Sequence, residues 1–112
     1  MKVKYCVVLV TVPRKAGEAR RLLRLVLEKR LAACVNVLKA VDSFFWWEGK
    51  IDSAREDLLV IKTRAALVPA LTRAIRKAHS YDVCEVVALP IVGGNKPYLD
   101  WLGASCRKGT GT

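Results

Sequence analysis

The chain has 112 residues, of which 53% are hydrophobic, and it carries 20 Lys and Arg against 10 Asp and Glu, a formal net charge of +10. This length suits one domain with one core, and this hydrophobic fraction excludes a disordered chain. No apolar run reaches the roughly 18 residues of a membrane-spanning helix, and residues 1–5 lead into a strand-like pattern without the apolar segment of a signal peptide. We therefore expect a soluble cytoplasmic protein that does not associate with a membrane.

The excess positive charge indicates either a solvated surface or an anionic partner such as nucleic acid. Much of it falls on the outer faces of two predicted helices: Arg20, Arg21, Arg24, Lys29, Arg30, Arg73, Arg76 and Lys77. No basic stripe alternates with stacking aromatics, as single-strand binders require. We therefore do not expect nucleic acid as the partner.

The first third of the chain predicts a strand and a helix. Residues 3–12 are a continuous apolar run, typical of a strand buried on both faces, and Pro13 ends it. In residues 15–31 apolar side chains return every three or four positions, which predicts an amphipathic helix.

Residues 31–63 predict a long β-hairpin with its turn at Glu48-Gly49-Lys50. Four consecutive aromatics, residues 44–47, sit beside that turn. Because aromatics bury large areas and dominate interface energies, we expect the tip to contact a partner surface. Asp42 and Ser43 interrupt the alternation, so we expect a bulge or kink there.

The rest of the chain predicts a helix, a strand and a short helix. Thr63 is placed to cap a helix whose apolar stripe is Val68, Leu71, Ile75 and Ala78. Residues 85–92 predict a fourth strand, in which Pro90 requires an edge, an end or a bulge. A turn at residues 93–95 precedes a helix beginning at residues 98–102, and the Gly/Thr-rich tail, 107–112, is expected to be flexible.

This order predicts an α+β fold, βαββαβ plus a short C-terminal helix, in one domain over residues 1–106. Right-handed crossovers with both long helices on one face of an antiparallel sheet give the ferredoxin-like split βαβ sandwich. That fold supports many unrelated activities and does not identify a function.

The four cysteines, Cys6, Cys34, Cys84 and Cys106, have no CxxC spacing. In a cytoplasmic chain this argues against a disulfide framework or a zinc finger. Cys6 and Cys34 fall in apolar strand patterns, where a buried cysteine usually acts as a small hydrophobe.

Candidate metal ligands cluster between the second helix and the fourth strand: His79, Tyr81, Asp82, Cys84 and Glu85. Imidazole, thiolate and carboxylate are ligands for divalent transition metals. The alternative is that His79 only caps the helix. With one histidine, no nucleophile–base pair and no phosphate-binding glycine loop in the sequence, we do not expect an enzyme or an organic cofactor.

A series of motifs resembles the CutA divalent-cation-tolerance proteins over about residues 3–103. The matching stretches are residues 8–13 (VLVTVP), 28–36 (EKRLAACVN), 46–50 (WWEGK), 59–63 (LVIKT) and 88–91 (ALPI), followed by Asn95, Tyr98, Leu99, Trp101 and Leu102. The resemblance implies a ferredoxin-like homotrimer, similar in assembly to the PII signalling proteins, with the long hairpins joining sheets between subunits. It also implies a role in tolerance to copper and other divalent cations.

The sequence departs from the pattern of copper-binding members of this family. They place a cysteine just before the Thr-x-Pro of the first strand and a histidine pair before Pro-Tyr, where this chain has Val10, and Ala78 with His79. Their Pro-Glu after the tyrosine appears here as Cys84-Glu85. Of that ligand set only His79 is retained.

These observations lead to one hypothesis and one alternative. The hypothesis is a homotrimer that binds copper or another divalent cation in inter-subunit clefts, with His79, Cys84, Glu85 and Cys34 as ligands. The cleft or interface residues are expected to be Trp46, Trp47, Glu48, Lys62 and Tyr81. The alternative is a non-enzymatic trimeric scaffold, or a PII-like signalling module, that binds a protein or a small anion.

Overall fold

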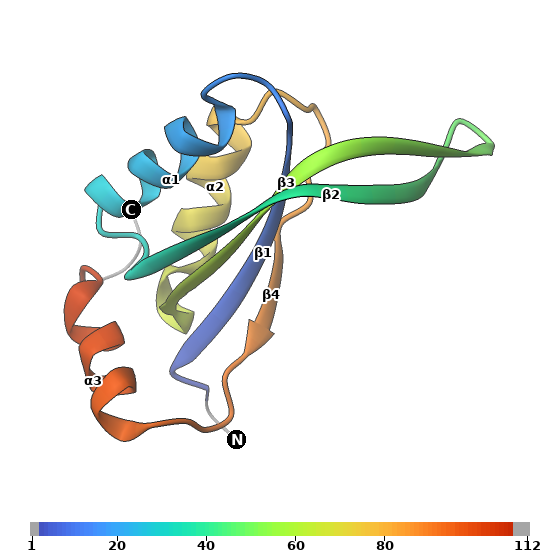
Figure 1. The fold of residues 1–112 in the computed structure, drawn as a ribbon. Helices are drawn as coiled ribbons and strands as arrows, with labels where there is room; N and C mark the ends of the chain where they lie inside the picture. The colour runs from blue at the N-terminus through green and yellow to red at the C-terminus, as the bar shows by residue number, and fades with distance from the viewer. Residues whose placement is uncertain (1–2, 109–112) are drawn as a thin grey trace.

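A four-stranded antiparallel sheet with the first two α-helices against one face forms the fold (Figure 1). The computed structural model describes residues 3–108. The strands are β1 (Tyr5–Pro13), β2 (Cys34–Trp47), β3 (Lys50–Arg64) and β4 (Val87–Pro90), in the order β2-β3-β1-β4. The helices are α1 (Glu18–Glu28), the short 3₁₀ helix η1 (Ala65–Leu67), α2 (Val68–Ala78) and α3 (Lys96–Ser105). The predicted ferredoxin-like architecture is confirmed.

The core lies between the sheet and helices α1 and α2. Alternate residues of β1, among them Val8, Val10 and Val12, are fully buried, and Leu22 of α1 and Ile75 of α2 belong to the same cluster. The residues between them in β1 are only partly buried. The prediction that β1 is buried on both faces was therefore wrong, because α1 and α2 cover only one of them.

The hairpin of β2 and β3 has the predicted turn and extends well beyond the body of the molecule (Figure 1). Glu48 and Gly49 both have positive φ, 50° and 79°, as a tight hairpin turn requires. The bulge, however, is not at Asp42-Ser43. The register shifts between Leu38 and Val41.

The position of the bulge follows from one carboxylate. Ala40 has a positive φ of 62°, and its N–H donates to Oδ1 of Asp57 at 3.1 Å. This bond satisfies an amide that the ladder leaves unpaired at a bulge. Asp42 and Ser43 pair in regular register with Arg55 and Ala54.

Thr63 does not cap the second helix. Its side chain is fully buried, and its hydroxyl donates to the Leu31 carbonyl at 2.6 Å, tying β3 to the segment after α1. Residues 65–67 form η1 before α2 begins, and neither helix has a side-chain cap. The residue type suited a cap, but the alternation of β3 turns Thr63 towards the core.

In the C-terminal third, the observed lengths of the strand and the helix differ from the predicted lengths. β4 covers four residues rather than the predicted 85–92, and it is an edge strand, as Pro90 requires. Helix α3 runs to Ser105, and a Cβ on its Gly103 would lie 2.9 Å from the Tyr5 hydroxyl. In the predicted tail the Arg107 amide donates to the Arg30 carbonyl at 2.8 Å, and residues 109–112 lie outside the described part.

Among residues 3–108, no helix has the length and apolarity needed to cross a membrane.

The Thr63 hydroxyl gives a test of this packing. Thr63→Val leaves the buried Leu31 carbonyl without its donor, and we expect a loss of about 1–3 kcal/mol in the free energy of unfolding, measured by urea denaturation at fixed protein concentration. Thr63→Ser keeps the hydroxyl and should lose clearly less. Equal losses in the two variants would mean that the methyl group, and not the hydrogen bond, matters.

Candidate functional site

His79, the first predicted metal ligand, is already engaged on both ring nitrogens. It is 8% exposed, and its Nδ1 accepts from the Tyr81 backbone N–H at 3.0 Å. Since Nδ1 accepts, Nε2 carries the proton and donates to the Thr11 carbonyl at 2.8 Å. His79 therefore joins the end of α2 to β1, and a metal could bind it only by replacing one of these bonds.

The predicted cysteine ligands lie apart from His79. Cys34 is on the sheet face away from α1 and α2, next to Lys62, whose Nζ is 4.0 Å from its Sγ, and it contacts Tyr98 of α3. Cys84 is half-buried against the core. Within residues 3–108, no three or more His, Cys, Asp or Glu side chains are grouped closely enough to hold a metal ion.

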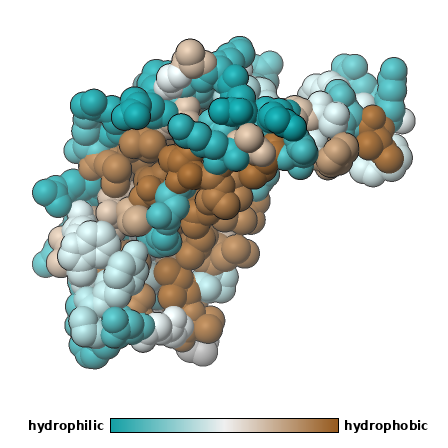
Figure 2. Space-filling model, in the orientation of Figure 1, coloured by the Kyte–Doolittle hydropathy of each residue, from teal (hydrophilic) through white to brown (hydrophobic). Residues whose placement is uncertain are grey.

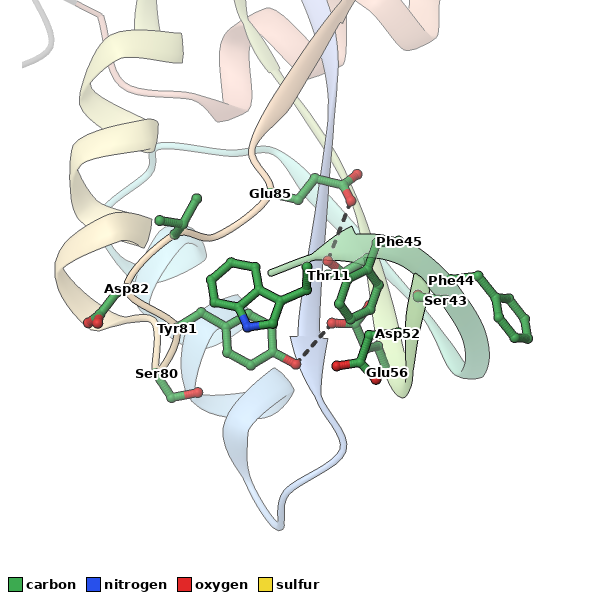
Figure 3. A pocket seen from close by; sticks show the side chains of 12 residues that line it. Thr11, Ser43, Phe44, Phe45, Asp52, Glu56, Ser80, Tyr81, Asp82 and Glu85 are labelled. Atoms are coloured by element: carbon green, nitrogen blue, oxygen red, sulfur yellow. Dashed lines mark hydrogen bonds between the residues drawn. The ribbon is translucent and has the colours of Figure 1, made fainter. Parts of the chain in front are cut away.

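Other predicted residues converge on a cleft of about 620 Å³ between the outer half of the hairpin and the α2–β4 connection (Figure 3). Tyr81, Glu85 and Trp47, three of the predicted ligand or cleft residues, line it. The full lining is Thr11, Ser43, Phe44, Phe45, Trp47, Asp52, Glu56, Ser80, Tyr81, Asp82, Val83 and Glu85.

Tyr81 and Glu56 are linked across the cleft. The Tyr81 hydroxyl donates to Oε2 of Glu56 at 3.0 Å. Burial, the hydrogen bond to Glu56 and the negative charges of Glu56 and Glu18 together raise the pKa of Tyr81 to about 12. The phenol therefore stays protonated at neutral pH and fixes the position of a carboxylate that is itself mostly buried.

Glu85 is the second carboxylate near β1. Its Oε1 is 3.5 Å from the Thr11 hydroxyl, and its side chain is exposed. Figure 3 shows Glu85 and Glu56 on either side of Thr11. Two carboxylates thus approach β1 from different segments, and neither has an ion pair with a lysine or arginine among the described residues.

The cleft is acidic although the chain is strongly basic. Asp52, Glu56, Asp82 and Glu85 line it, and no lysine or arginine of residues 3–108 does. Its walls include the aromatic rings of Phe45, Trp47 and Tyr81. Negative charge beside aromatic faces favours a cationic ligand.

The two faces of the hairpin tip have different environments. Phe45 and Trp47 point to the cleft side, whereas Trp46 pairs across the strands with Ile51 on the opposite face. Trp46 and Ile51 are 73% and 67% exposed. Glu48 lies in the turn itself. Of the two predicted tryptophans, only Trp47 belongs to the cleft.

The sheet face away from α1 and α2, called here the open face, is also apolar. In the register, Leu9 of β1 lies between Val60 and Val87, and Val7 lies next to Leu89. Val87 and Leu89 are 45% and 46% exposed. Figure 2 shows hydrophobic side chains gathered over β1 and β4.

Sequence reasoning missed Glu56, Asp52 and Phe45. A signal for Glu56 was present: Glu56-Asp57 are charged residues inside a strand that is otherwise apolar through Thr63. Both are buried in the structure. A charged pair at such a place requires specific partners, which are Tyr81 for Glu56 and Arg14 with the Ala40 amide for Asp57.

Similar proteins of known name are numerous. "Protein CutA 1, chloroplastic" of Oryza sativa is 50% identical over 102 residues, which are 91% of this chain and 57% of the rice protein. The divalent-cation tolerance protein CutA of Thermus thermophilus is 43% identical over 105 residues, 94% of this chain and 97% of that protein. The crystal structure of CutA1 from Oryza sativa superposes with a TM-score of 0.91 at 48% identity, covering 96% of this chain and 97% of that one.

The names of these relatives correct the predicted location. The chain spans about half the length of the plant and animal relatives it matches. The rice and Arabidopsis thaliana relatives are named chloroplastic, and the matching Archaeoglobus fulgidus structure is described as periplasmic. The prediction of a cytoplasmic protein was wrong, because relatives of this domain occur in other compartments and its composition does not fix the compartment.

The family model of the CutA1 divalent ion tolerance protein matches residues 6–105, almost the whole described chain. With the relatives and the superposed structures, this match shows that the chain belongs to the CutA1 divalent ion tolerance family.

Proposed function

We propose that this divalent-cation tolerance protein acts as a homotrimer that binds divalent cations in clefts between its subunits, without a catalytic step. The observation that carries the proposal is the acidic cleft beside two exposed apolar surfaces. The number three comes from the family resemblance. The apolar surfaces support burial against another copy.

Burial of the open face and of the outer side of the hairpin tip would cover several of the large exposed apolar side chains. Soluble monomers rarely expose contiguous apolar patches of more than a few hundred Å². Here the exposed side chains include Trp46 and Ile51 at the tip and Val87 and Leu89 on the edge strand β4. Since β2 and β4 are both sheet edges, pairing between copies would also protect them.

The cleft offers a half-complete cation site. Glu56 and Glu85 approach it from β3 and from the α2–β4 connection, and carboxylate oxygens bind divalent cations. Among residues 3–108 a single chain groups no three His, Cys, Asp or Glu side chains closely enough to hold a metal ion. The hairpin projects from the cleft wall, so a neighbouring copy packed on it would be positioned to contribute one.

The proposal includes no catalytic step because both ring nitrogens of the one histidine in the sequence form hydrogen bonds within the fold. His79 is buried and holds β1 and the Tyr81 amide with its two nitrogens. A general base must reach the proton that it abstracts. His79 does not line the cleft.

The trimer is tested by mass. We expect the wild type to give three times the 12.4 kDa of the chain in light scattering after size exclusion, and Trp46→Lys/Ile51→Lys to give a smaller species. Ala66→Lys, an exposed position on η1, adds charge away from both surfaces and should leave the mass unchanged. A wild-type monomer at micromolar concentration would exclude the proposed assembly.

Cation binding is tested by calorimetric titration with Cu²⁺ and Mn²⁺. Glu56→Gln/Glu85→Gln removes both carboxylates and should weaken binding by about tenfold or more, whereas Glu28→Gln on α1 removes a carboxylate far from the cleft and should not. His79→Ala should lower the melting temperature and weaken binding less than the double variant does, because the histidine acts on the cleft through Tyr81. If His79→Ala abolishes binding in a folded protein while the double variant binds normally, the cation is bound by His79 and not by the carboxylates of the cleft.

The Tyr81–Glu56 pair predicts a difference at alkaline pH. Because the pKa of Tyr81 rises from 10.0 to about 12 in the fold, its contribution to stability is complete below pH 10.0 and is lost as the pH rises through about 12. The unfolding free energy of the wild type should therefore fall more steeply over this interval than that of Tyr81→Phe. Parallel pH profiles of the two proteins would show that Tyr81 is not held by Glu56.

A further inference from the structure

A second concave region lies on the helix side of the sheet and differs in charge from the acidic cleft. It has a volume of about 460 Å³ and lies where the β1–α1 connection, the first turns of α1 and the bulge of β2 meet. We call it the basic pocket. Its lining is Arg14, Lys15, Ala16, Gly17, Ala19, Arg20, Leu23, Val37, Lys39 and Asp57.

Asp57 contacts two of the segments that form this pocket. Its Oδ1 forms an ion pair with Arg14, 3.0 Å from Nε, and accepts a hydrogen bond from the Ala40 N–H at 3.1 Å. The same carboxylate thus fixes the β1–α1 connection and the bulge of β2. Val35 and Val37 pair with core-facing Ile61 and Leu59, so Lys39, two residues on, continues the row on the helix side.

The cations of the pocket exceed its one carboxylate. Arg14 is paired with Asp57, but Lys15, Arg20 and Lys39 form no ion pair with any of residues 3–108. These three come from a loop, a helix and a strand. Their convergence on one hollow is a property of the fold and not of a basic run in the sequence.

The positive charge of the basic pocket does not come from the N-terminus of α1. The first-turn carboxylate of α1, Glu18, is buried and turned away from the pocket, where it accepts from the Ser80 amide at 3.1 Å and lies 3.6 Å from Arg21. Its negative charge offsets part of the partial positive charge at the N-terminus of α1. The positive charge of the pocket therefore comes from the side chains of Arg14, Lys15, Arg20 and Lys39.

We propose that the basic pocket binds a small, multiply charged oxyanion, the chemistry of a phosphate-bearing metabolite. Guanidinium and ammonium groups on several sides suit phosphate oxygens, with Arg20 able to donate two parallel hydrogen bonds. The lining also includes the apolar side chains of Ala19, Leu23 and Val37, which would contact an uncharged part of the ligand.

This site is independent of the proposed cation cleft and of the proposed assembly. It lies on the side of the sheet covered by α1, whereas the surfaces proposed for the trimer are the open face and the outer side of the hairpin tip. It stays accessible when those surfaces are buried. Loss of anion binding and loss of the trimer can therefore be measured separately.

The test uses the full chain and inorganic pyrophosphate, which is multiply charged and has no base or sugar, at constant ionic strength. We expect saturable binding by calorimetry, with backbone amide NMR shifts concentrated in residues 14–20 and at Lys39. Arg20→Gln/Lys39→Gln should weaken binding by about tenfold or more. Arg76→Gln/Lys77→Gln, at two exposed positions of α2, lowers the net charge equally and should leave binding within about twofold.

Three outcomes would overturn the proposal. The first is the absence of saturable binding in a folded wild type. The second is equal weakening in the two double variants, which would mean only a response to net charge. The third is a set of shifts outside the pocket. Adenosine 5′-monophosphate as a second probe should bind more tightly than inorganic phosphate if Ala19 and Leu23 contact the uncharged part of the ligand, and equal affinity would restrict the site to the oxyanion alone.

Discussion

Val8, Val10 and Val12 of β1 are completely buried against the helices, while Val7 and Leu9 of the same strand remain partly exposed because α1 and α2 do not cover their side of the sheet. Helices α1 and α2 form one layer on one side of the sheet, which gives a single core, and α3 contacts the end of the other side at Tyr5 and Arg64. The rest of that second face is apolar. Most of the surface features of the molecule follow from this asymmetry. The open face requires a covering, and the hairpin extends past the region that the helices could cover.

The same asymmetry separates the charges. Cations lie on the outer faces of α1 and α2 and around the basic pocket, whereas the cleft next to the hairpin is lined by carboxylates. Asp57 and Glu56 are neighbours in β3 and alternate between the two sides. Asp57 therefore organises the basic pocket, while Glu56 joins Tyr81 in the acidic cleft. Two adjacent buried carboxylates thus serve regions of opposite charge.

The fold could be predicted from the sequence because each element had a clear period and the crossovers are right-handed. The predictions of the helix cap and of the bulge were wrong because tertiary contacts determine both. Thr63 is a good capping residue, but the Leu31 carbonyl recruits its hydroxyl, and the bulge moved to Ala40 because Asp57 accepts its amide. Part of the cleft lining could be predicted, since Tyr81, Glu85 and Trp47 are in it. Glu56 is marked in the sequence only as a charged residue inside an apolar strand. Its place opposite the α2–β4 connection, like that of Asp52, follows from the hairpin register.

His79 shows why a cluster of ligand types in sequence is weak evidence for a metal. An imidazole is most useful to a metal when one nitrogen is free and the other is held by a hydrogen bond. In this chain the Tyr81 amide holds Nδ1 and the Thr11 carbonyl holds Nε2. These two bonds place Tyr81 at the cleft wall, where its hydroxyl positions Glu56. The histidine therefore contributes to the cleft by fixing the loop that carries Tyr81, and the charge that would attract a cation comes from the carboxylates.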